Sequence, residues 1–284
     1  MRILVLGSSG ILGNYLSHFL NKNFKVFTNG LKKRRIDLLN VIEVEKLLKR
    51  IKPKVIINCA ALTSIDACEK NKKIAFNVNY KILKNTVDVL KKNRLDTKII
   101  QISTDQFYNN KLKKFNKESI NYIPNYYCKT KKLAEQICIK NNLIVVRTNF
   151  FGKSNSKNKS FSDWIYKSFR SDEEFYLLND VYFSPLNLLT LSKMIKKIVE
   201  KIEVTKGIFN IGSRNCISKK NFAIKFAKLC NIYKKNYRLI DAKSLFTTKR
   251  PRFMCMNTRK FEKHLKVKMP TIKSQIFYEV KKYK

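Results

Sequence analysis

The chain has 284 residues, with 61 lysines and arginines against 20 aspartates and glutamates, and its formal net charge is +41. Hydrophobic residues make up 44% and charged residues 29%, which are values of a globular protein and exclude a largely disordered chain. The basic residues are spread over nearly every predicted helix and loop without an RNA- or DNA-binding motif, so a general lysine bias accounts for the charge and we expect no nucleic-acid partner.

The first strand is predicted at Ile3 to Leu6, and Gly7, Gly10 and Gly13 follow it directly. Glycine permits a tight turn, and the amphipathic helix that begins behind these glycines offers free N–H groups to a pyrophosphate. The strand before and the helix after favour a dinucleotide site over a simple turn, although the spacing is GxxGxxG rather than GxGxxG. Because the chain before this strand is too short for a signal peptide and no apolar run approaches about 18 residues, we expect no signal peptide, no membrane span and a cytoplasmic protein.

The second strand is predicted at Lys25 to Thr28, and no acid follows it where NAD-specific enzymes often carry one. The basic run Lys32–Arg35 instead favours NADPH, whose 2′-phosphate it would contact, with NADH as the alternative. Asp37 is the first acid available, and its position before Leu38 suggests a contact with adenine.

Three further strands are predicted at Lys54 to Asn58, Lys98 to Ser103 and Leu143 to Arg147. Helical segments separate them, and one of these begins with a capping box of Asn40 and Glu43 and ends before Pro53. This alternation predicts an α/β fold with a doubly wound parallel sheet, the Rossmann architecture.

Thr104 follows the fourth strand, and the next helical segment carries Tyr127 and Lys131 on one face. A phenol with a pKa of about 10 is a poor acid–base group at neutral pH, but a neighbouring ammonium favours the phenolate and lowers that pKa. Tyr127 can then exchange a proton with a substrate carbonyl that the Thr104 hydroxyl holds. A tyrosine and a lysine four residues apart also occur together on ordinary helix surfaces. The presence of Thr104 is what favours a catalytic role for Tyr127 and Lys131.

A Ser/Asn/Lys-rich stretch after Gly152 predicts a domain boundary. We expect a NAD(P)-binding Rossmann domain at 1–152 and a mostly substrate-binding lobe at 153–284, with some segments returning to the first domain. The seven cysteines form no CxxC pair, and His18 and His264 have no metal-ligand spacing. We therefore expect reduced cysteines, no disulfide framework and no metal site.

The chain resembles an extended short-chain dehydrogenase/reductase and is closest to the dTDP-4-dehydrorhamnose reductase family. The resemblance covers nearly the whole chain. It rests on the following residues: GSSGILG at Gly7–Gly13, Asp37–Leu38, NCAALTSID at Asn58–Asp66, Glu69, Asn79, STDQF at Ser103–Phe107, Tyr127, Lys131, RTNFFG at Arg147–Gly152, NDVYFSP at Asn179–Pro185 and Arg250–Pro251.

The resemblance implies NADPH-dependent reduction of a nucleotide-activated 4-keto-6-deoxysugar for polysaccharide synthesis, with Thr104, Tyr127 and Lys131 as catalytic residues. It implies these cofactor contacts: Gly7, Gly10, Ile11, Leu12, Gly13, Asp37, Leu38, Ala60, Ala61, Leu62, Thr63, Tyr127 and Lys131. The implied substrate contacts are Thr104, Asp105, Phe150 and Arg250. We expect a nucleotide-sugar substrate and consider a homodimer as the assembly.

Two residues depart from the family pattern and leave the sugar open: Phe150 stands in place of Trp, and Gln106 in place of a common Tyr. Related 4,6-dehydratases carry Glu at the position of Gln106, and because an amide cannot act as their base, dehydration is disfavoured. A nucleotide-sugar epimerase remains an alternative. Another is a non-catalytic NADP-binding regulatory subunit, since proteins resembling this family are partners of methionine adenosyltransferase.

Overall fold

The computed structural model describes residues 1–31, 34–109, 115–119 and 121–284, and the chain divides into two compact units. Unit 1 comprises Met1–Ser103, Asn125–Val146 and Met194–Ile208. Unit 2 comprises Thr104–Pro124, Arg147–Lys193 and Phe209–Lys284. The chain therefore changes units several times. The predicted division into 1–152 and 153–284, with some segments returning to the first domain, remains a prediction. That unit 2 binds the substrate remains a prediction.

The central sheet has six strands in the order β12-β7-β6-β5-β1-β2. Their bounds are Arg2–Leu6 for β1, Lys25–Thr28 for β2, Val55–Asn58 for β5, Lys98–Thr104 for β6, Ile144–Thr148 for β7 and Gly207–Ile211 for β12. β1 pairs in parallel with β2 and β5, and β5 pairs in parallel with β6. The predicted α/β fold with a parallel sheet is confirmed. The sequence indicated five of these strands and missed β12.

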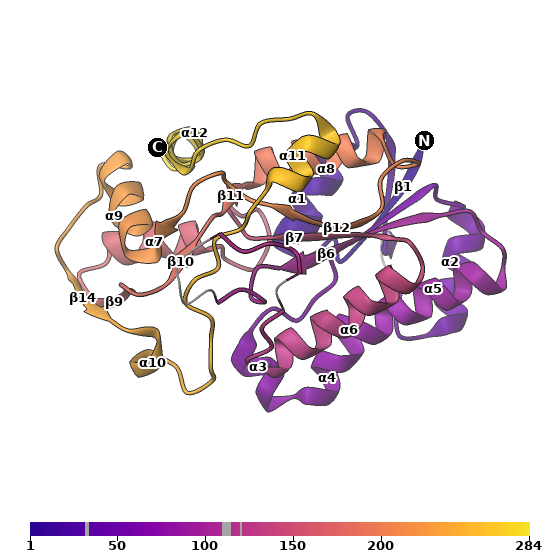
Figure 1. Ribbon diagram of the computed structural model, residues 1–284, viewed down its shortest axis with the longest axis horizontal. Helices are drawn as coiled ribbons and strands as arrows, with labels where there is room; N and C mark the ends of the chain where they lie inside the picture. Colours follow the sequence, from indigo (N-terminus) through magenta and orange to yellow (C-terminus); the bar gives the residue numbers. More distant parts are fainter. Residues whose placement is uncertain (32–33, 110–114, 120) are drawn as a thin grey trace. The chain divides into compact units, whose positions relative to one another are not determined.

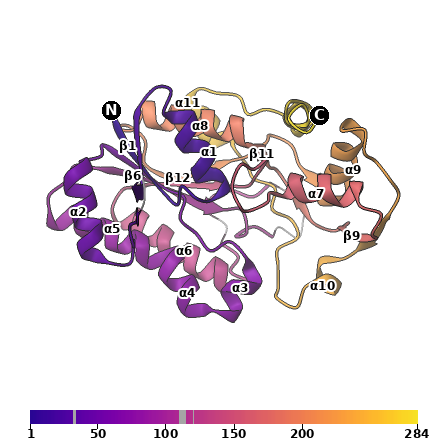
Figure 2. The same ribbon diagram turned by 180° about the vertical axis from the view of Figure 1, so that it is seen from behind.

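Helices cover both faces of this sheet, as expected for a doubly wound fold. In Figure 1, α2 (Val41–Ile51), α5 (Ile82–Lys92) and α6 (Tyr126–Lys140) lie on one side and α1 (Ile11–Leu20) on the other, and Figure 2 shows the same arrangement from behind. The inner strands of this sheet are buried on both faces, which explains apolar runs such as Val55–Ile57 in β5, where every residue is buried.

Helix α2 begins where the sequence predicted. The Asn40 side chain caps it by accepting hydrogen bonds from the N–H groups of Ile42 and Glu43. Glu43 Oε2 accepts a hydrogen bond from the N–H of Asp37, 3.0 Å away. The same segment thus fixes both the helix and the turn before it.

The rest of unit 1 consists of short elements. These are the antiparallel strands β3 (Gly30–Leu31) and β4 (Arg34–Arg35), the helices α3 (Ile65–Lys70) and α4 (Lys72–Phe76), and the π-helix η1 (Asn77–Lys81). A π-helical turn places an extra residue in the helix and is frequent at functional sites. Here it contains Asn79, which is buried.

Unit 2 has an aromatic core built by helices and short strand pairs. Its helices are α7 (Phe161–Arg170), α9 (Lys219–Leu229), α10 (Ala242–Leu245), α11 (Arg259–Leu265) and α12 (Ile272–Val280), and α8 (Leu188–Glu200) begins in it. Its strand pairs are β8 (Phe150–Phe151) with β11 (Leu186–Asn187), β9 (Phe175–Leu178) with β14 (Tyr237–Ile240), and β10 (Tyr182–Phe183) with β13 (Ile217–Ser218). Phe222 stacks edge-on against Phe151 at 4.8 Å between ring centroids.

None of the helices in the described part of the chain combines the length and the apolar character that crossing a membrane requires.

Candidate active site

The glycine turn between β1 and α1 is closely packed against the loop after β5. Gly7 has a φ of +76°, and a Cβ there would lie 2.5 Å from the backbone nitrogen of Ala60. A Cβ on Gly13 would lie 2.3 Å from the carbonyl oxygen of Gly7. Both positions therefore require glycine for the turn itself.

Gly10 differs from the other two glycines. It caps the N-terminus of α1 with φ −78° and ψ 167°, a conformation open to any residue. The nearest atom that a Cβ would meet is the carbonyl oxygen of Gly7 at 3.4 Å. Gly10 therefore leaves open space at a helix N-terminus, where the first N–H groups of α1, including those of Ile11 and Leu12, have no partner within the helix. Such a position suits a pyrophosphate.

A second feature of this turn was not predicted. The N–H of Gly7 donates a hydrogen bond to Asn29 Oδ1 at 3.2 Å, and Asn29 directly follows β2. A neutral amide therefore stands near the position where a carboxylate was sought. Of the basic run, Lys32 and Lys33 lie outside the described residues, and the backbone of Arg34 and Arg35 forms β4.

Asp37 and Leu38 have structural partners in unit 1. Asp37 Oδ1 accepts a hydrogen bond from the N–H of Leu39 at 2.9 Å. The Leu38 side chain is buried in the apolar core to which α2 and α5 contribute. Their contacts with adenine remain predictions.

Two buried amides fix the loop that holds Ala60, Ala61, Leu62 and Thr63. Asn58 Oδ1 accepts a hydrogen bond from the N–H of Ala60 at 3.1 Å. Asn79 binds both backbone groups of Leu62, through Oδ1 at 2.8 Å and through Nδ2 at 3.1 Å. Side chains of the chain itself therefore hold the loop backbone, which lies beside Gly7.

Asn79 also ties this loop to α6, because its Nδ2 donates to Thr130 Oγ1 at 3.1 Å. Two further side chains fix the first turn of α6. Glu69 Oε1 accepts a hydrogen bond from the N–H of Tyr126 at 2.6 Å, and Asn125 caps the helix. The loop after β5 and the helix with Tyr127 and Lys131 are thus one connected structure.

Tyr127 and Lys131 are both buried on α6. Lys131 is 3% exposed, and its Nζ donates a hydrogen bond of 2.6 Å to the carbonyl oxygen of Ile102 in β6. Burial lowers the pKa of Lys131 to about 8, and the negative charge of Glu135 opposes this shift. The structure therefore holds an ammonium at the carboxyl end of β6, two residues before Thr104.

Thr104 ends β6 and groups with unit 2, as do Asp105, Phe150 and Arg250. The Thr104 hydroxyl oxygen accepts a hydrogen bond from the N–H of Gln106 at 3.1 Å. Phe150 lies in β8 and is half-buried. Arg250 lies over the ring of Phe246, with its guanidinium carbon 3.6 Å from the ring centroid.

Asp105 is 1% exposed and is held by amides. Asn149 Nδ2 donates to its Oδ2 at 2.8 Å, and Gln106 Nε2 lies 3.4 Å from its Oδ1. Burial raises the pKa of Asp105 to about 6, whereas the Asn149 hydrogen bond and the Lys219 charge oppose this shift. Lys219 is only half-buried as a residue, but burial of its ammonium lowers its pKa. The sequence did not single out Asn149 or Lys219, since nothing distinguishes one lysine among so many.

The expectation that all cysteines are reduced is wrong for one pair. Cys216 and Cys255 form a disulfide in unit 2, with their Cα atoms 5.6 Å apart. They are 39 residues apart in sequence, so no local spacing could reveal them. The remaining cysteines are not part of a disulfide: Cys59, Cys68, Cys128, Cys138 and Cys230.

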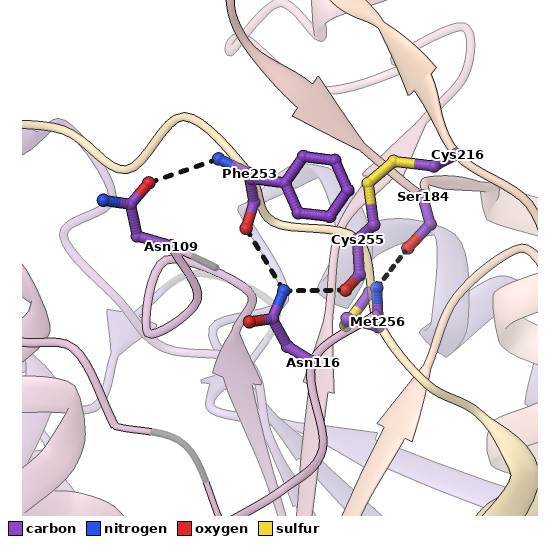
Figure 3. The surroundings of a disulfide bond; sticks show 7 residues. All are labelled: Asn109, Asn116, Ser184, Cys216, Phe253, Cys255 and Met256. Carbon is purple, nitrogen blue, oxygen red and sulfur yellow. Dashed lines mark hydrogen bonds between the residues drawn. A yellow bond between two sulfur atoms is a disulfide. The ribbon is translucent and has the colours of Figure 1, made fainter. Parts of the chain in front are cut away.

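The disulfide fastens the segment that follows Arg250, as Figure 3 shows. Asn116 Nδ2 donates hydrogen bonds to the carbonyl oxygens of Phe253 and Cys255, at 3.2 and 2.9 Å. Ser184 Oγ accepts one from the N–H of Met256 at 3.0 Å. Polar side chains from two other parts of unit 2 therefore hold the same strand-like segment as the disulfide.

The chain is similar in sequence to a known protein family and to reductase and polysaccharide biosynthesis proteins. The family model described as RmlD substrate binding domain matches residues 1–284. The dTDP-4-dehydrorhamnose reductase of Aggregatibacter actinomycetemcomitans is 26% identical over 231 residues, which cover 78% of this chain and 77% of the relative. The spore coat polysaccharide biosynthesis protein SpsK of Bacillus subtilis is 25% identical over 232 residues, with the same coverage of 78% and 77%.

A solved structure shows the same fold over the whole chain. It is dTDP-4-dehydrorhamnose reductase from Bacillus anthracis in complex with NADP, with a TM-score of 0.88 and 24% identity, and the match covers 100% of this chain and 99% of that one. The resemblance found in the sequence motifs is therefore confirmed at the level of family and fold.

Proposed function

This chain belongs to the RmlD substrate binding domain family, and we propose that it is an NADPH-dependent reductase of a nucleotide-activated 4-keto-6-deoxysugar. The names of its relatives, a dTDP-4-dehydrorhamnose reductase and a polysaccharide biosynthesis protein, support this substrate class. The observation that carries the proposal is the buried Lys131 ammonium, which is bonded to the end of β6 and lies one helical turn from Tyr127.

The glycine turn fits a dinucleotide. Gly7 and Gly13 have no room for a Cβ, so the backbone turn is closely packed, whereas the position of Gly10 is open at the N-terminus of α1. We assign the pyrophosphate to the N–H groups of this helix end. The rest of the cofactor would lie along Asp37 and the rigid loop from Ala60 to Thr63, as the sequence predicted.

Reduction of a ketone needs one hydride and one proton. When bound, NADPH supplies the hydride to the carbonyl carbon. Tyr127 Oη donates the proton to the carbonyl oxygen, so the product is an alcohol and Tyr127 is left as a phenolate. The Lys131 ammonium favours that phenolate, and the Thr104 hydroxyl holds the substrate oxygen. Tyr127 then recovers its proton from solvent.

The proposed substrate contacts are Thr104, Asp105, Phe150 and Arg250. Asp105 offers a carboxylate in a fixed position, because Asn149 binds it. Arg250 offers a guanidinium, a group that suits a diphosphate. The amide of Gln106 cannot abstract a ring proton, which favours reduction over dehydration. A cytoplasmic location and a homodimer remain part of this proposal.

A panel of nucleotide-linked keto sugars, assayed by the loss of NADPH absorbance, tests the proposal. We expect turnover with a 4-keto-6-deoxysugar and a preference for NADPH over NADH.

In Tyr127→Phe, kcat should fall by about 10²- to 10⁴-fold because the proton donor is lost, while the Kd for NADPH changes little. Normal turnover in this variant would remove Tyr127 from the mechanism, and exchange of sugar epimers without net NADPH use would favour an epimerase.

A further inference from the structure

Glu135 is a buried acid on the helix of the proposed catalytic residues, and the mechanism above does not use it. It is 0% exposed and lies four residues after Lys131 on α6. Ser103 Oγ donates a hydrogen bond of 2.6 Å to its Oε1. The ammonium of Lys132 lies 3.9 Å from its Oε2. A carboxylate is costly to bury, so its place in the core of unit 1 requires a reason.

Lys131 and Glu135 on α6 bind successive residues of β6. Lys131 Nζ donates to the carbonyl oxygen of Ile102, and the next residue, Ser103, donates to Glu135. Residues four apart on a helix lie on the same face. Lys131 and Glu135 therefore share one face of α6 and bind the last residues of the strand that leads to Thr104.

The three cysteines that act on Lys131 are protonated near pH 8. Burial raises the pKa of Cys59, after β5, and of Cys138, on α6, to about 12. It raises the pKa of Cys68, on α3, to about 11. Tyr127, one turn earlier on α6, is the proposed proton donor. Among the described residues that act on Lys131, this leaves Glu135 as the source of negative charge.

We propose that Glu135 is a positioning residue, whose carboxylate, held by Ser103, keeps Lys131 as an ammonium at the end of β6. The assignment deepens the proposed reductase function and rests on it for its effect on turnover. Glu135 itself acts through Lys131 and need not touch substrate or cofactor.

The proposal predicts a change in the pH profile. Burial lowers the pKa of Lys131, and the negative charge of Glu135 raises it. Without that charge the ammonium loses its proton at lower pH, so activity that depends on it is lost at lower pH. In Glu135→Gln, the alkaline limb of kcat/KM should move down by about 1 pH unit or more. The glutamine keeps the shape of the glutamate side chain and an oxygen that accepts the hydrogen bond from the Ser103 hydroxyl.

Two variants separate charge from packing. Glu135→Asp keeps the charge in a shorter side chain, and its alkaline limb should stay closer to that of the natural protein than the limb of Glu135→Gln. Glu279→Gln removes another carboxylate that is 0% exposed, one that accepts a hydrogen bond of 2.9 Å from the N–H of Lys153 in unit 2. It should lower Tm without moving the limb. An unshifted limb in Glu135→Gln, or an equal shift in Glu279→Gln, would overturn the proposal.

A second measurement needs no substrate. The ε-carbon of Lys131 can be titrated by NMR in ¹³C-lysine-labelled protein, with the signal assigned from its absence in Lys131→Met. A lower pKa of Lys131 in Glu135→Gln supports the positioning role even if no keto sugar is turned over. A lack of turnover would count only against the proposed reductase function. Turnover by the natural protein, together with an unchanged Lys131 titration in Glu135→Gln, would sink the positioning role and leave the reductase standing.

Discussion

Asp105 combines deep burial with an ionisable group, and its partners are amides rather than a close cation. Its pKa rises from 3.8 to about 6 because burial disfavours the charged form. The folded protein therefore binds more protons than the unfolded chain between about pH 4 and pH 6. Over this window the contribution of Asp105 to the free energy of unfolding falls as the pH rises. At neutral pH the protein carries the full cost of a buried carboxylate.

We expect Asp105→Asn to raise the free energy of unfolding by roughly 1–3 kcal/mol at pH 8, because the amide has no charge to desolvate. The gain should shrink through pH 6 and vanish near pH 4, where both side chains are neutral. Urea denaturation at these three pH values measures it. A gain of the same size at every pH would contradict the assigned pKa, and a loss of turnover in the same variant would show that the carboxylate is retained for substrate binding.

The glycine turn shows how one element divides its tasks among three glycines. Gly7 and Gly13 are required by the fold, since a Cβ on either would lie under 3 Å from backbone atoms. Gly10 has an ordinary backbone conformation and open space around it. An alanine at Gly10 therefore tests ligand binding almost separately from folding.

In Gly10→Ala we expect a Tm near that of the natural protein and a Kd for NADPH raised at least about tenfold, because the methyl group occupies the approach of the pyrophosphate. Gly7→Ala should instead lower the free energy of unfolding by roughly 2–4 kcal/mol, through its positive φ and its contact with Ala60. Thermal unfolding and fluorescence titration with NADPH measure the two effects. Unchanged NADPH affinity in Gly10→Ala would place the pyrophosphate elsewhere.

On the scale of the whole molecule, one covalent link joins distant parts of the chain. The Cys216–Cys255 disulfide lies within unit 2 and links two residues that are 39 positions apart in the sequence. A loop of this length stabilises the folded state by about 2–4 kcal/mol, mainly by restricting the unfolded chain. The same segment carries Arg250, so the link also limits how far a proposed substrate residue can move.

Reduction should therefore lower Tm by several degrees, because the unfolded chain regains its freedom. Alkylation in denaturant should modify five cysteines without reductant, those outside the disulfide, and all seven after reduction. The Cys216→Ser and Cys255→Ser double variant serves as the control, since its Tm should not respond to reductant. Seven modified cysteines in the untreated protein would show that the link does not form.

The amino-acid sequence by itself determined the features that are local. Five strands of the sheet, the cap at Asn40, the glycine turn and the shared face of Tyr127 and Lys131 follow from periodicity and from the conformations that single residues allow. Each of these depends on residues within about one or two turns of chain, which a pattern can capture. The recognised motifs extended this reading to the family.

Only the tertiary structure decided which distant residues meet. The sixth strand β12, the Ser103–Glu135 hydrogen bond across 32 residues, the Asn58–Gln101 bond across 43 and the pairing of two cysteines among seven are of this kind. A buried polar group must find a partner, but its sequence neighbours do not say which one. That choice is made when the strands and helices pack, and it fixes the surroundings of Lys131 and Asp105 on which the proposed chemistry depends.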